Sequence, residues 1–531
     1  MSFLDVLLLA ATYAACIIIP LSILFGSYNL FFHPLRRYPG PLVGRLTEAY
    51  GGYFAWKKNY HLATYQNFLE YGPVFRQSPN RLMFNSMTAV FDIYLNPRVT
   101  KGQSYANSQL TAKYPSLINA IDSKQHRRKR KIIAPVITER SMKKFEPTMS
   151  EHVNVFLQQL LASCESGGAI DMTERFQRLG IDVVGQLAFG YPFNTQTDET
   201  HRFVPEVINA MSRRIYTYMQ LPSITPYYVE KLCLLFNIRT LIKFEKTIRT
   251  MIKTRMSQDK DAHHDLYSFV AGHIGKEQDA FLPGEMWPEA FFFIIAGGVT
   301  TATTMSAMFF YLTRNPKSYA ALAREIRSTF NSASEIHSGP QLAGCKYLRA
   351  CIDETLRMSP PTVGTLWRQQ EKSDDEPLIV DGHVIPRGTQ VGVSLYSLMH
   401  NEEYFPDSFT YTPERWLEPP EGTVETEEEK AKRATMRKVF VPFLVGDRAC
   451  AGKAMAYMEA SLTMARTMWF FDFEGAPGKP GELGAGELGR TDGRGRPGEF
   501  QLDDLFVTAH QGPNLIFKPR GDYWKELQTV D

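Results

Sequence analysis

Ten residues near the C-terminus, 443–452, limit the possible folds of this chain more than any other segment and read Phe-Leu-Val-Gly-Asp-Arg-Ala-Cys-Ala-Gly. They place Cys450 between Gly446 and Gly452, where the backbone can turn and pack closely against a flat ligand. Arg448 precedes the cysteine, and an apolar helix is predicted just after it. A cysteine near a helix N-terminus and a guanidinium has a lowered pKa, so we expect a thiolate, a strong donor to iron. A lone loop cysteine is more often a buried structural residue, but this combination favours a metal ligand.

The overall composition is that of an ordinary globular protein. Of the 531 residues, 44% are hydrophobic and 22% charged, which excludes a disordered chain, a collagen and a small disulfide-dense protein. The net charge is +3, from 59 basic and 56 acidic residues, and this balance does not indicate nucleic-acid binding. The 6 cysteines show no CxxC pair and no zinc-like spacing, so we interpret them as isolated thiols in a reducing compartment.

An uncharged apolar segment, Val6 to Phe25, occupies the N-terminal region. At about 1.5 Å of rise per residue, it is long enough to cross the roughly 30 Å hydrocarbon core of a bilayer as a helix. Asp5 precedes it, whereas Arg36 and Arg37 follow it. Because positive charge stays on the cytoplasmic side, the rest of the chain is expected to face the cytosol. The alternative, a cleaved signal peptide, fits less well because the segment is too long and no basic stretch precedes it.

Two further segments bear on the membrane topology. Residues 33–41 contain three prolines and a glycine, which cannot continue a helix, so we predict a stiff hinge between the membrane and a soluble body. Ala290 to Leu312 is again long, apolar and uncharged, but it contains a glycine pair and four threonines. Its length alone would permit a second membrane span. We instead predict the buried central helix of a large globular domain.

The soluble body is predicted to be mainly helical. Between residues 100 and 360 most segments have the periodicity of amphipathic helices, whereas strand-like segments are few and short. A hairpin is expected at 378–380 and 383–385, joined by an Asp-Gly turn. A glycine-rich stretch, 475–498, is predicted to be a flexible surface insertion. We therefore divide the chain into a membrane anchor (1–27), a proline-rich hinge (28–41) and a single catalytic domain (42–531).

The FxxGxRxCxG pattern of residues 443–452 is complete and resembles the haem-binding loop of the cytochrome P-450 superfamily, the haem-thiolate monooxygenases, and specifically its membrane-bound fungal members. The resemblance implies a mainly α fold: a single large multi-helix cytochrome P-450 domain with small β-sheets, preceded by one N-terminal transmembrane helix. It also implies haem b (iron protoporphyrin IX) as cofactor, with Cys450 as the axial thiolate ligand. Arg448 is then expected to pair with a haem propionate, Phe443 to pack near the thiolate and Gly446 to contribute to the cofactor site.

A second motif, Glu354-Thr355-Leu356-Arg357, puts an acid and a base three residues apart on one face of a predicted helix. Taken alone, such a pair usually lies on the surface. Downstream, the segment Pro413-Glu414-Arg415-Trp416 supplies a third charge. The superfamily has an ExxR helix and a PERF-like loop that lock together behind the haem, and Glu354, Arg357 and Arg415 match those positions. The resemblance implies a buried structural network that holds the cysteine loop in register.

A basic segment, residues 126–131, reads His-Arg-Arg-Lys-Arg-Lys and by itself suggests a solvated helix face. The superfamily has a WxxxR pattern on this helix. Here His126 replaces the tryptophan and Arg130 keeps the arginine. The resemblance implies that both hydrogen-bond a haem propionate and that Arg368 is a further propionate partner. The remaining cations are predicted to form a docking patch for an acidic electron donor.

The segment Ala296 to Thr301 resembles the oxygen-activation segment of the long central helix. By this resemblance Gly297 lets the helix approach the haem and leaves room for dioxygen, and Thr300 donates a hydrogen bond to the dioxygen held there. The acidic residue that usually precedes the threonine is Val299 here. The sequence leaves open whether water, Thr301 or a substrate hydroxyl relays protons instead.

These features together predict a haem-dependent monooxygenase, an oxidoreductase that hydroxylates, epoxidises or similarly oxidises an apolar small molecule. By resemblance, its partners are O2, NADPH–cytochrome P-450 reductase and the lipid bilayer, with no nucleic-acid partner. The substrate is expected to be an intermediate of fungal secondary-metabolite biosynthesis. The expected location is the endoplasmic reticulum membrane, single-pass, with the catalytic domain facing the cytosol.

Two other functions stay open at this point. One is a haem-thiolate enzyme that catalyses a non-insertion reaction, such as desaturation, ring coupling, isomerisation or dehydration, for which Val299 is the indication. The other is a non-enzymatic membrane protein with a degenerate haem site, against which the intact cysteine loop argues. Loops at 105–118, 202–228 and 362–366 are expected to line the pocket, and their Tyr, Phe and Leu residues predict a largely apolar ligand without identifying it.

Overall fold

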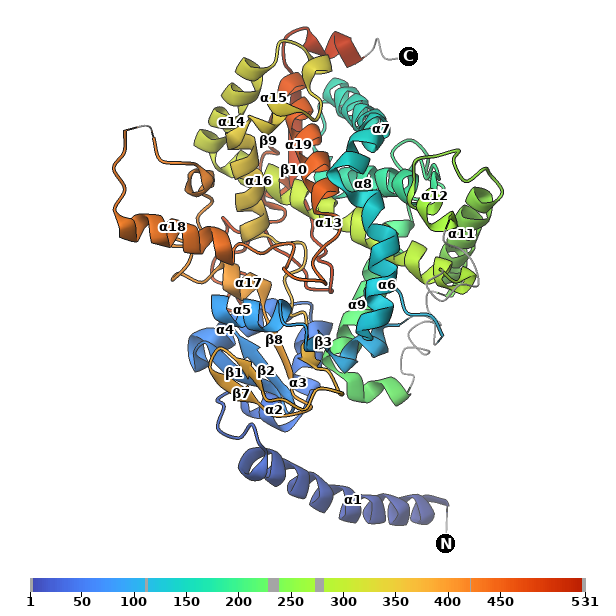
Figure 1. The fold of residues 1–531 in the computed structure, drawn as a ribbon, viewed down its shortest axis with the longest axis vertical. Coiled ribbons are helices and arrows are strands. Elements are labelled where there is room, and N and C mark those ends of the chain that lie inside the picture. Colours follow the sequence, from blue (N-terminus) through green and yellow to red (C-terminus); the bar gives the residue numbers. More distant parts are fainter. Residues whose placement is uncertain (1–2, 110–112, 228–237, 273–280, 421, 528–531) are drawn as a thin grey trace.

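The computed structural model describes residues 3–109, 113–227, 238–272, 281–420 and 422–527. One helix, α1 (Phe3–Ser27), extends away from a large body in which many helices surround small sheets (Figure 1). The prediction of a mainly helical domain with small sheets is confirmed.

The body is built from amphipathic helices whose apolar faces meet in a shared core. Its longest helix, α13 (Met286–Arg314), runs through the centre and packs along α8. The other long helices are α4 (Tyr60–Tyr71), α6 (Ser123–Ile133), α7 (Glu139–Ser166), α8 (Met172–Phe189), α9 (Val204–Gln220), α11 (Ile238–Met256), α14 (Pro316–Thr329), α16 (Lys346–Met358), α18 (Glu427–Val439) and α19 (Lys453–Phe470). Shorter ones are α2 (Leu42–Leu46), α3 (Ala49–Trp56), α5 (Met87–Tyr94), α12 (Leu266–Ala271), α15 (Pro340–Ala343) and α17 (Leu395–Met399).

The strands of the described residues form three small sheets. A five-stranded sheet has the order β1 (Val74–Ser78), β2 (Arg81–Phe84), β8 (Gln390–Val393), β5 (Arg368–Gln370), β3 (Val99–Lys101). A three-stranded sheet has the order β4 (Ile170–Asp171), β10 (Asn514–Pro519), β9 (Phe471–Gly475). The predicted hairpin is present as β6 (Leu378–Val380) and β7 (His383–Ile385), paired antiparallel across the Asp-Gly turn.

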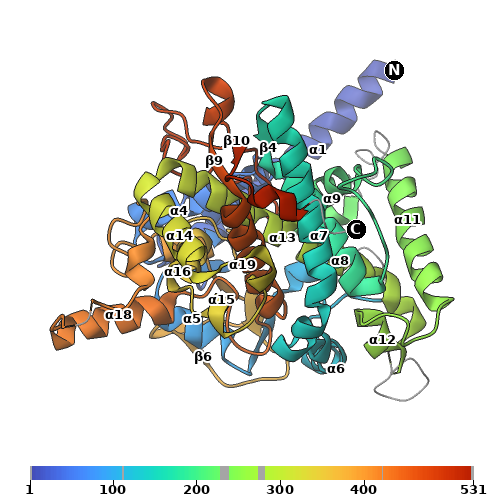
Figure 2. The ribbon, with the colours of Figure 1, turned by 90° about the horizontal axis from the view of Figure 1, so that it is seen from above.

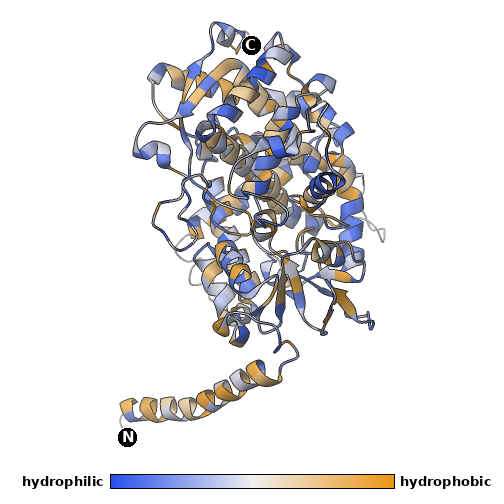
Figure 3. Ribbon diagram, turned by 90° about the vertical axis from the view of Figure 1, so that its left-hand side faces the viewer, coloured by the Kyte–Doolittle hydropathy of each residue, from blue (hydrophilic) through white to orange (hydrophobic). Residues whose placement is uncertain are grey.

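Two helices of the described residues are long and apolar enough to cross a membrane. The most apolar stretch of the first, Phe3–Phe32, is not buried at all. In the second, Pro283–Arg314, 72% of the most apolar stretch is buried inside the body. The hydropathy colouring shows α1 as a mostly apolar rod outside the body (Figure 3). The prediction that 290–312 is a buried core helix is confirmed, and the exposed N-terminal helix is consistent with a single membrane anchor.

The predicted hinge, residues 28–41, packs against the body. Leu35 and Tyr38 are buried in the apolar cluster that contains β2. Arg76 donates a hydrogen bond of 2.7 Å to the Asn29 carbonyl oxygen. These contacts hold the segment that connects α1 to the body. The domain boundaries at 27 and 41 stay predictions.

Two insertions lie at the surface. One contains the acidic residues 427–429, which open α18. This helix begins with a capping box and projects from the body (Figure 2). The glycine-rich stretch 475–498 is tied to its surroundings, for example by a 3.1 Å hydrogen bond from Arg494 to the Leu502 carbonyl oxygen. Neither insertion reaches the cavity described below.

Candidate active site

The cysteine loop has a backbone shape that requires glycine at one position. Gly446 has φ of +80°, and a Cβ atom there would lie 2.2 Å from the Tyr94 carbonyl oxygen. The loop closes when the Cys450 N–H donates to the Phe443 carbonyl oxygen at 2.8 Å. Helix α19 starts three residues later. Cys450 therefore sits at the entrance to this helix, as the sequence predicted.

The side chain of Cys450 opens into an internal cavity. Burial raises the pKa of the Cys450 thiol, and the backbone of Gly452 and the charge of Arg130 only partly offset this. Arg448 points elsewhere, because its guanidinium donates to the carbonyl oxygens of residues 120 and 121. The expectation that Arg448 and the helix start lower this pKa is therefore wrong for the protein alone. An apolar setting favours the thiol, and a bound metal cation supplies the charge that stabilises thiolate.

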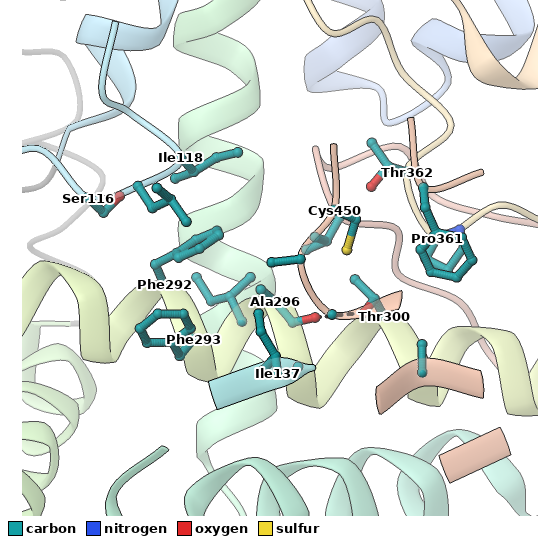
Figure 4. A pocket seen from close by; sticks show the side chains of 18 of the residues that line it. Ser116, Ile118, Ile137, Phe292, Phe293, Ala296, Thr300, Pro361, Thr362 and Cys450 are labelled. Carbon is teal, nitrogen blue, oxygen red and sulfur yellow. Dashed lines mark hydrogen bonds between the residues drawn. The ribbon is translucent and has the colours of Figure 1, made fainter. Parts of the chain in front are cut away.

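A cavity of about 320 Å³ lies in front of the cysteine. Cys450 and Thr300 face the same space, with Ser116 and Ile118 towards one end and Pro361 and Thr362 towards the other (Figure 4). The three loop ranges expected to line the pocket all contribute to it, through Ser108, Tyr114, Ser116, Leu117, Ile118, Ser212, Ile215, Thr362 and Leu366. Positions 110–112 and 228 of those ranges lie outside the described residues.

Helix α13 lines much of this cavity. Its small and hydroxyl-bearing lining residues include Ala296, Gly297, Thr300, Thr301 and Thr304. The Thr300 hydroxyl donates its hydrogen to the Ala296 carbonyl oxygen at 2.6 Å. In this arrangement it can accept a hydrogen bond from a guest in the cavity. Donating one, as we expected, requires the side chain to give up its bond to Ala296.

Val299 is not among the described residues that line the cavity. It is 2% exposed and belongs to an apolar cluster with Ile181 and Ile295. An acidic side chain placed here would enter the apolar core. The absence of an acid at this position therefore leaves the polarity of the cavity wall unchanged.

The glycines of this segment also serve helix packing. A Cβ atom at Gly297 would lie 2.6 Å from Val184 of α8, and a Cβ atom at Gly180 would lie 2.3 Å from the Gly298 carbonyl oxygen. Small residues thus let the backbones of α8 and α13 approach closely. Gly297 also lines the cavity, so packing against α8 is a second role beside the predicted one.

The predicted propionate partners gather beside the cavity. His126 and Arg130 on α6 and Arg448 in the loop line it, while Arg368 in β5 is buried close behind. Arg130 donates to the Ala449 carbonyl oxygen at 3.0 Å. Burial, followed by the charges of the neighbouring cations, lowers the pKa of His126 to about 2, so its imidazole is neutral.

A further cation, Lys101 at the end of β3, escaped the sequence analysis. It is 3% exposed and lines the cavity, and its ammonium group donates to the Leu117 and Ile118 carbonyl oxygens at 2.9 and 2.8 Å. Burial, followed by the charges of Arg448 and Arg368, lowers the pKa of Lys101 well below its ordinary value. No local pattern marks this residue, because its partners come from distant parts of the chain.

The charge of this cluster fits a dianionic cofactor. The cluster contains four cations: Lys101, Arg130, Arg368 and Arg448. Within the part of the chain that the structure describes, none of the four lies at ion-pair distance from a carboxylate. Burial and the nearby Arg368 lower the pKa of Arg448 to about 10. Buried charges are normally paired. An apolar ring with two carboxylates and a central iron would satisfy these cations, the apolar walls and Cys450 together.

The basic segment 126–131 is not a uniformly exposed face. Arg127 and Lys131 are exposed, but Lys129 is 0% exposed, and Arg128 pairs with Glu285 at 2.5 Å. The predicted docking patch is therefore limited, on this segment, to Arg127 and Lys131.

The three charges predicted to act together behind the loop do contact one another. Arg357 donates from Nε and Nη2 to the two carboxylate oxygens of Glu354 at 2.9 Å each, and Arg415 donates from Nε at 3.0 Å. Trp416 adds its indole N–H at 2.9 Å. Burial alone would raise the pKa of Glu354, but Arg357 and Arg415 with these hydrogen bonds hold it below its ordinary value. The carboxylate is fully buried, ionised and surrounded by donors.

Glu459 on α19 is a second residue that the sequence analysis missed. It is 0% exposed, and neither carboxyl oxygen has a hydrogen-bond partner among the described residues. Burial raises the pKa of Glu459 to about 8, and the nearby Thr301 hydroxyl lowers this pKa only in part. The Thr301 hydroxyl itself donates to the Gly297 carbonyl oxygen. The signal in the sequence is an acid on the apolar helix face that also holds Met455 and Leu462. It is a neutral acid beside the cavity-lining segment of α13.

A helical domain with a cavity-facing cysteine beside a cluster of cations is the arrangement expected of a haem-thiolate protein. The family profile described as cytochrome P-450 matches residues 34–484. Cytochrome P-450 monooxygenase poxM of Penicillium oxalicum is 34% identical over 505 residues, covering 93% of this chain and 92% of that protein. Monooxygenase AKT7 of Alternaria alternata is 30% identical (92% and 94% covered), and atnE of Emericella nidulans is 29% identical (94% and 94%).

The chain belongs to the cytochrome P-450 family. It is an oxidoreductase of the monooxygenase class, and the family implies haem with a cysteine thiolate ligand, O2, a small-molecule substrate and a redox partner. The exposed N-terminal helix is consistent with a membrane anchor.

Proposed function

We propose that this cytochrome P-450 uses haem b, O2 and electrons from NADPH, delivered by a cytochrome P-450 reductase, to insert oxygen into an apolar intermediate of fungal secondary metabolism. The observation that carries this proposal is the cavity in front of Cys450, whose walls are mainly aliphatic and aromatic, including Phe291, Phe292, Ile295 and Leu356. Apolar walls favour apolar ligands and exclude water. The fungal relatives, all called monooxygenases, support the same reading.

The residues of the chain divide the work between cofactor and substrate. When bound, haem supplies the electron-transfer and oxygen chemistry at its iron. Cys450 would hold the iron, and Lys101, Arg130, Arg368 and Arg448 would hold the propionates. The apolar walls orient the substrate. Thr300 offers a hydroxyl oxygen at the cavity surface that can hold a proton donated by a guest.

The proposal is tested with the full-length protein and a reductase. Extracts of a strain that lacks the protein serve as substrates, with NADPH and isotopically labelled dioxygen. Incorporation of the label into a consumed metabolite supports oxygen insertion. Turnover without the label supports the non-insertion alternative, which rests on Val299. Desaturation or ring coupling would require NADPH, whereas isomerisation or dehydration would proceed without it. Absence of any turnover, with or without NADPH, contradicts both functions.

We expect Thr300→Ala to raise hydrogen peroxide release several-fold relative to product. Without this hydroxyl, protons reach reduced dioxygen in a less ordered way, and more electrons from NADPH end in peroxide. Peroxide and product per NADPH are measured in parallel. Thr313→Ala is the matched control, because Thr313 makes the same kind of bond to the carbonyl four residues back but lies outside the cavity. Unchanged coupling in Thr300→Ala would show that the oxygen-activation role belongs to another residue.

Val299→Glu is expected to bring no gain in coupling. Because the side chain at 299 points into the apolar core, an unpaired carboxylate there costs about 3–5 kcal/mol of stability. The variant should therefore melt at a lower temperature, and its product yield per NADPH should not exceed that of the wild type. A higher yield would mean that the wild-type enzyme lacks an efficient proton supply.

Deletion of residues 1–27 is expected to release the protein from membranes without loss of haem binding. We place the protein in the endoplasmic reticulum membrane, with α1 as its single span and the catalytic domain in the cytosol. The only other long apolar helix in the described residues is the largely buried α13. Alkaline extraction of membranes and the haem absorbance of the soluble fraction are measured. Alkali-resistant retention of the truncated chain would contradict the single-span topology.

A further inference from the structure

A buried charge network lies next to the cavity without belonging to the cation cluster that fits haem. Glu289 in the first turn of α13 and Lys129 on α6 are 2% and 0% exposed. Glu289 Oε1 and Lys129 Nζ are 2.8 Å apart, and Lys129 Nζ is also 3.0 Å from Glu285 Oε1. Burying three charged groups carries a large desolvation cost, which their ion-pair and hydrogen-bond partners must offset.

Both Glu289 and Lys129 also bind the backbone of the cavity wall. The Leu117 N–H donates to Glu289 Oε2 at 3.1 Å, and Lys129 Nζ donates to the Pro115 carbonyl oxygen at 2.7 Å. From the other side, Lys101 donates to the Leu117 carbonyl oxygen at 2.9 Å. Side chains from α13 and β3 therefore hold the N–H and the C=O of Leu117, and a side chain from α6 holds the C=O of Pro115.

These side chains replace the backbone partners that a helix or strand would supply. Residues 115–119 have no regular secondary structure, yet they line the cavity through Ser116, Leu117, Ile118 and Asn119. The side chains of Ser116 and Ile118 project into the space that Cys450 and Thr300 face (Figure 4). A buried backbone without such partners would be costly and free to shift.

We propose that Glu289 and Lys129 are positioning residues that fix residues 115–119 as a rigid wall of the substrate pocket. By fixing this wall they determine which ligands fit in front of Cys450 and which ligand atom faces it. The inference rests on the proposed function in that the cavity takes the substrate. The contacts themselves involve only residues of the chain.

A purely stabilising ion pair is the competing explanation, and two substitutions at one position separate the two. Glu289→Leu removes the charge and the acceptor of the Leu117 N–H, whereas Glu289→Gln removes the charge but keeps an acceptor oxygen. In both variants Lys129 keeps Glu285 as a partner. Asp182→Asn is the matched control, because Asp182 is a buried carboxylate that accepts the backbone N–H groups of Thr195 and Gln196, outside the cavity.

The first measurement is hydrogen exchange of peptides covering residues 113–121 in the haem-loaded, full-length protein. In Glu289→Leu the Leu117 amide should exchange about tenfold faster, the factor that about 1.4 kcal/mol of local stability gives. Glu289→Gln should show a smaller change, and Asp182→Asn none in these peptides. Unchanged exchange in Glu289→Leu, or equal changes in Glu289→Leu and Glu289→Gln, would overturn the positioning role. If Glu289→Leu yields no folded protein, faster exchange in Glu289→Gln than in Asp182→Asn supports the proposal, and equal exchange overturns it.

The second measurement compares the affinities of imidazole and of a bulky azole, and both are monitored through the haem spectrum. Imidazole needs little space, so its affinity should stay the same in Glu289→Leu, while that of the bulky azole should change several-fold. Equal effects on both ligands would overturn the proposal, because they would indicate a general loss of structure. The exchange experiment needs no turnover, so its result stands even if no substrate is oxidised. Absence of the haem-thiolate spectrum from the wild type would instead contradict the proposed function.

Discussion

Replacing Cys450 with alanine is expected to abolish the long-wavelength Soret band of the reduced, carbon monoxide-treated protein while the chain still folds. This band requires a thiolate at the iron, and Cys450 is the cysteine among the described residues that lines the cavity. The loop should persist, because its closing hydrogen bond uses the backbone N–H of residue 450 and the Phe443 carbonyl oxygen. The absorbance spectrum and the thermal unfolding curve are both recorded.

Cys164→Ala is the matched control for this experiment. Cys164 is partly buried on α7, its thiol donates to the Leu160 carbonyl oxygen, and it is not among the residues that line the cavity. This variant should keep the full band. A Cys450→Ala protein that retains the band would mean that the axial ligand has been assigned to the wrong residue.

The main features of the site could be predicted because they depend on short patterns. The spacing in residues 443–452 gave the position of Cys450 at the start of α19, and the Glu354–Arg357 spacing gave a contact on one helical face. The long apolar segment 290–312 was correctly assigned to the core, since its glycines and threonines suit packing against other helices.

Other features depend on contacts between distant parts of the chain and have no local pattern. Lys101 ends a three-residue strand and becomes part of the site only because β3, the cysteine loop and the segment 117–118 meet. Glu289 reads as an ordinary acidic residue of a helix first turn until Lys129 and Leu117 surround it. Such residues cannot be found from periodicity or spacing, because their role is set by tertiary burial.

The pKa of Cys450 illustrates the same limit. Local sequence predicted a lowered value from the helix start and Arg448, but Arg448 points to other groups, and burial outweighs the lowering by the Gly452 backbone and the charge of Arg130. The direction in which Arg448 points was also set by distant carbonyl groups, those of residues 120 and 121. Electrostatic effects add up over the whole environment, so a motif alone does not determine their sign.

Glu354→Ala is expected to lower haem content and thermal stability, not the activity of each haem-loaded molecule. The substitution leaves Arg357, which is 0% exposed, buried without its carboxylate, at a cost of about 3–5 kcal/mol. Arg357 also donates to the Met399 and Ser408 carbonyl oxygens at 2.9 and 2.7 Å, so its displacement would loosen the packing of these two segments. Haem per protein, melting temperature and turnover per haem are measured together.

An ion pair on the same helix whose arginine is exposed provides the matched control. Arg349 and Asp353 are 2.9 Å apart, the Arg349 side chain is 52% exposed, and Asp353 keeps the hydrogen bond from Tyr457 when Arg349 is removed. Arg349→Ala should therefore cost less stability than Glu354→Ala. Because folding lowers the pKa of Glu354, its ionised form stabilises the fold above the ordinary glutamate value of 4.5, and this contribution is lost as the pH falls through the lowered pKa. Glu354→Gln should therefore lose less stability than the wild type on acidification. Full haem loading of Glu354→Ala with a selective loss of turnover would contradict the structural role and point to direct participation in the reaction.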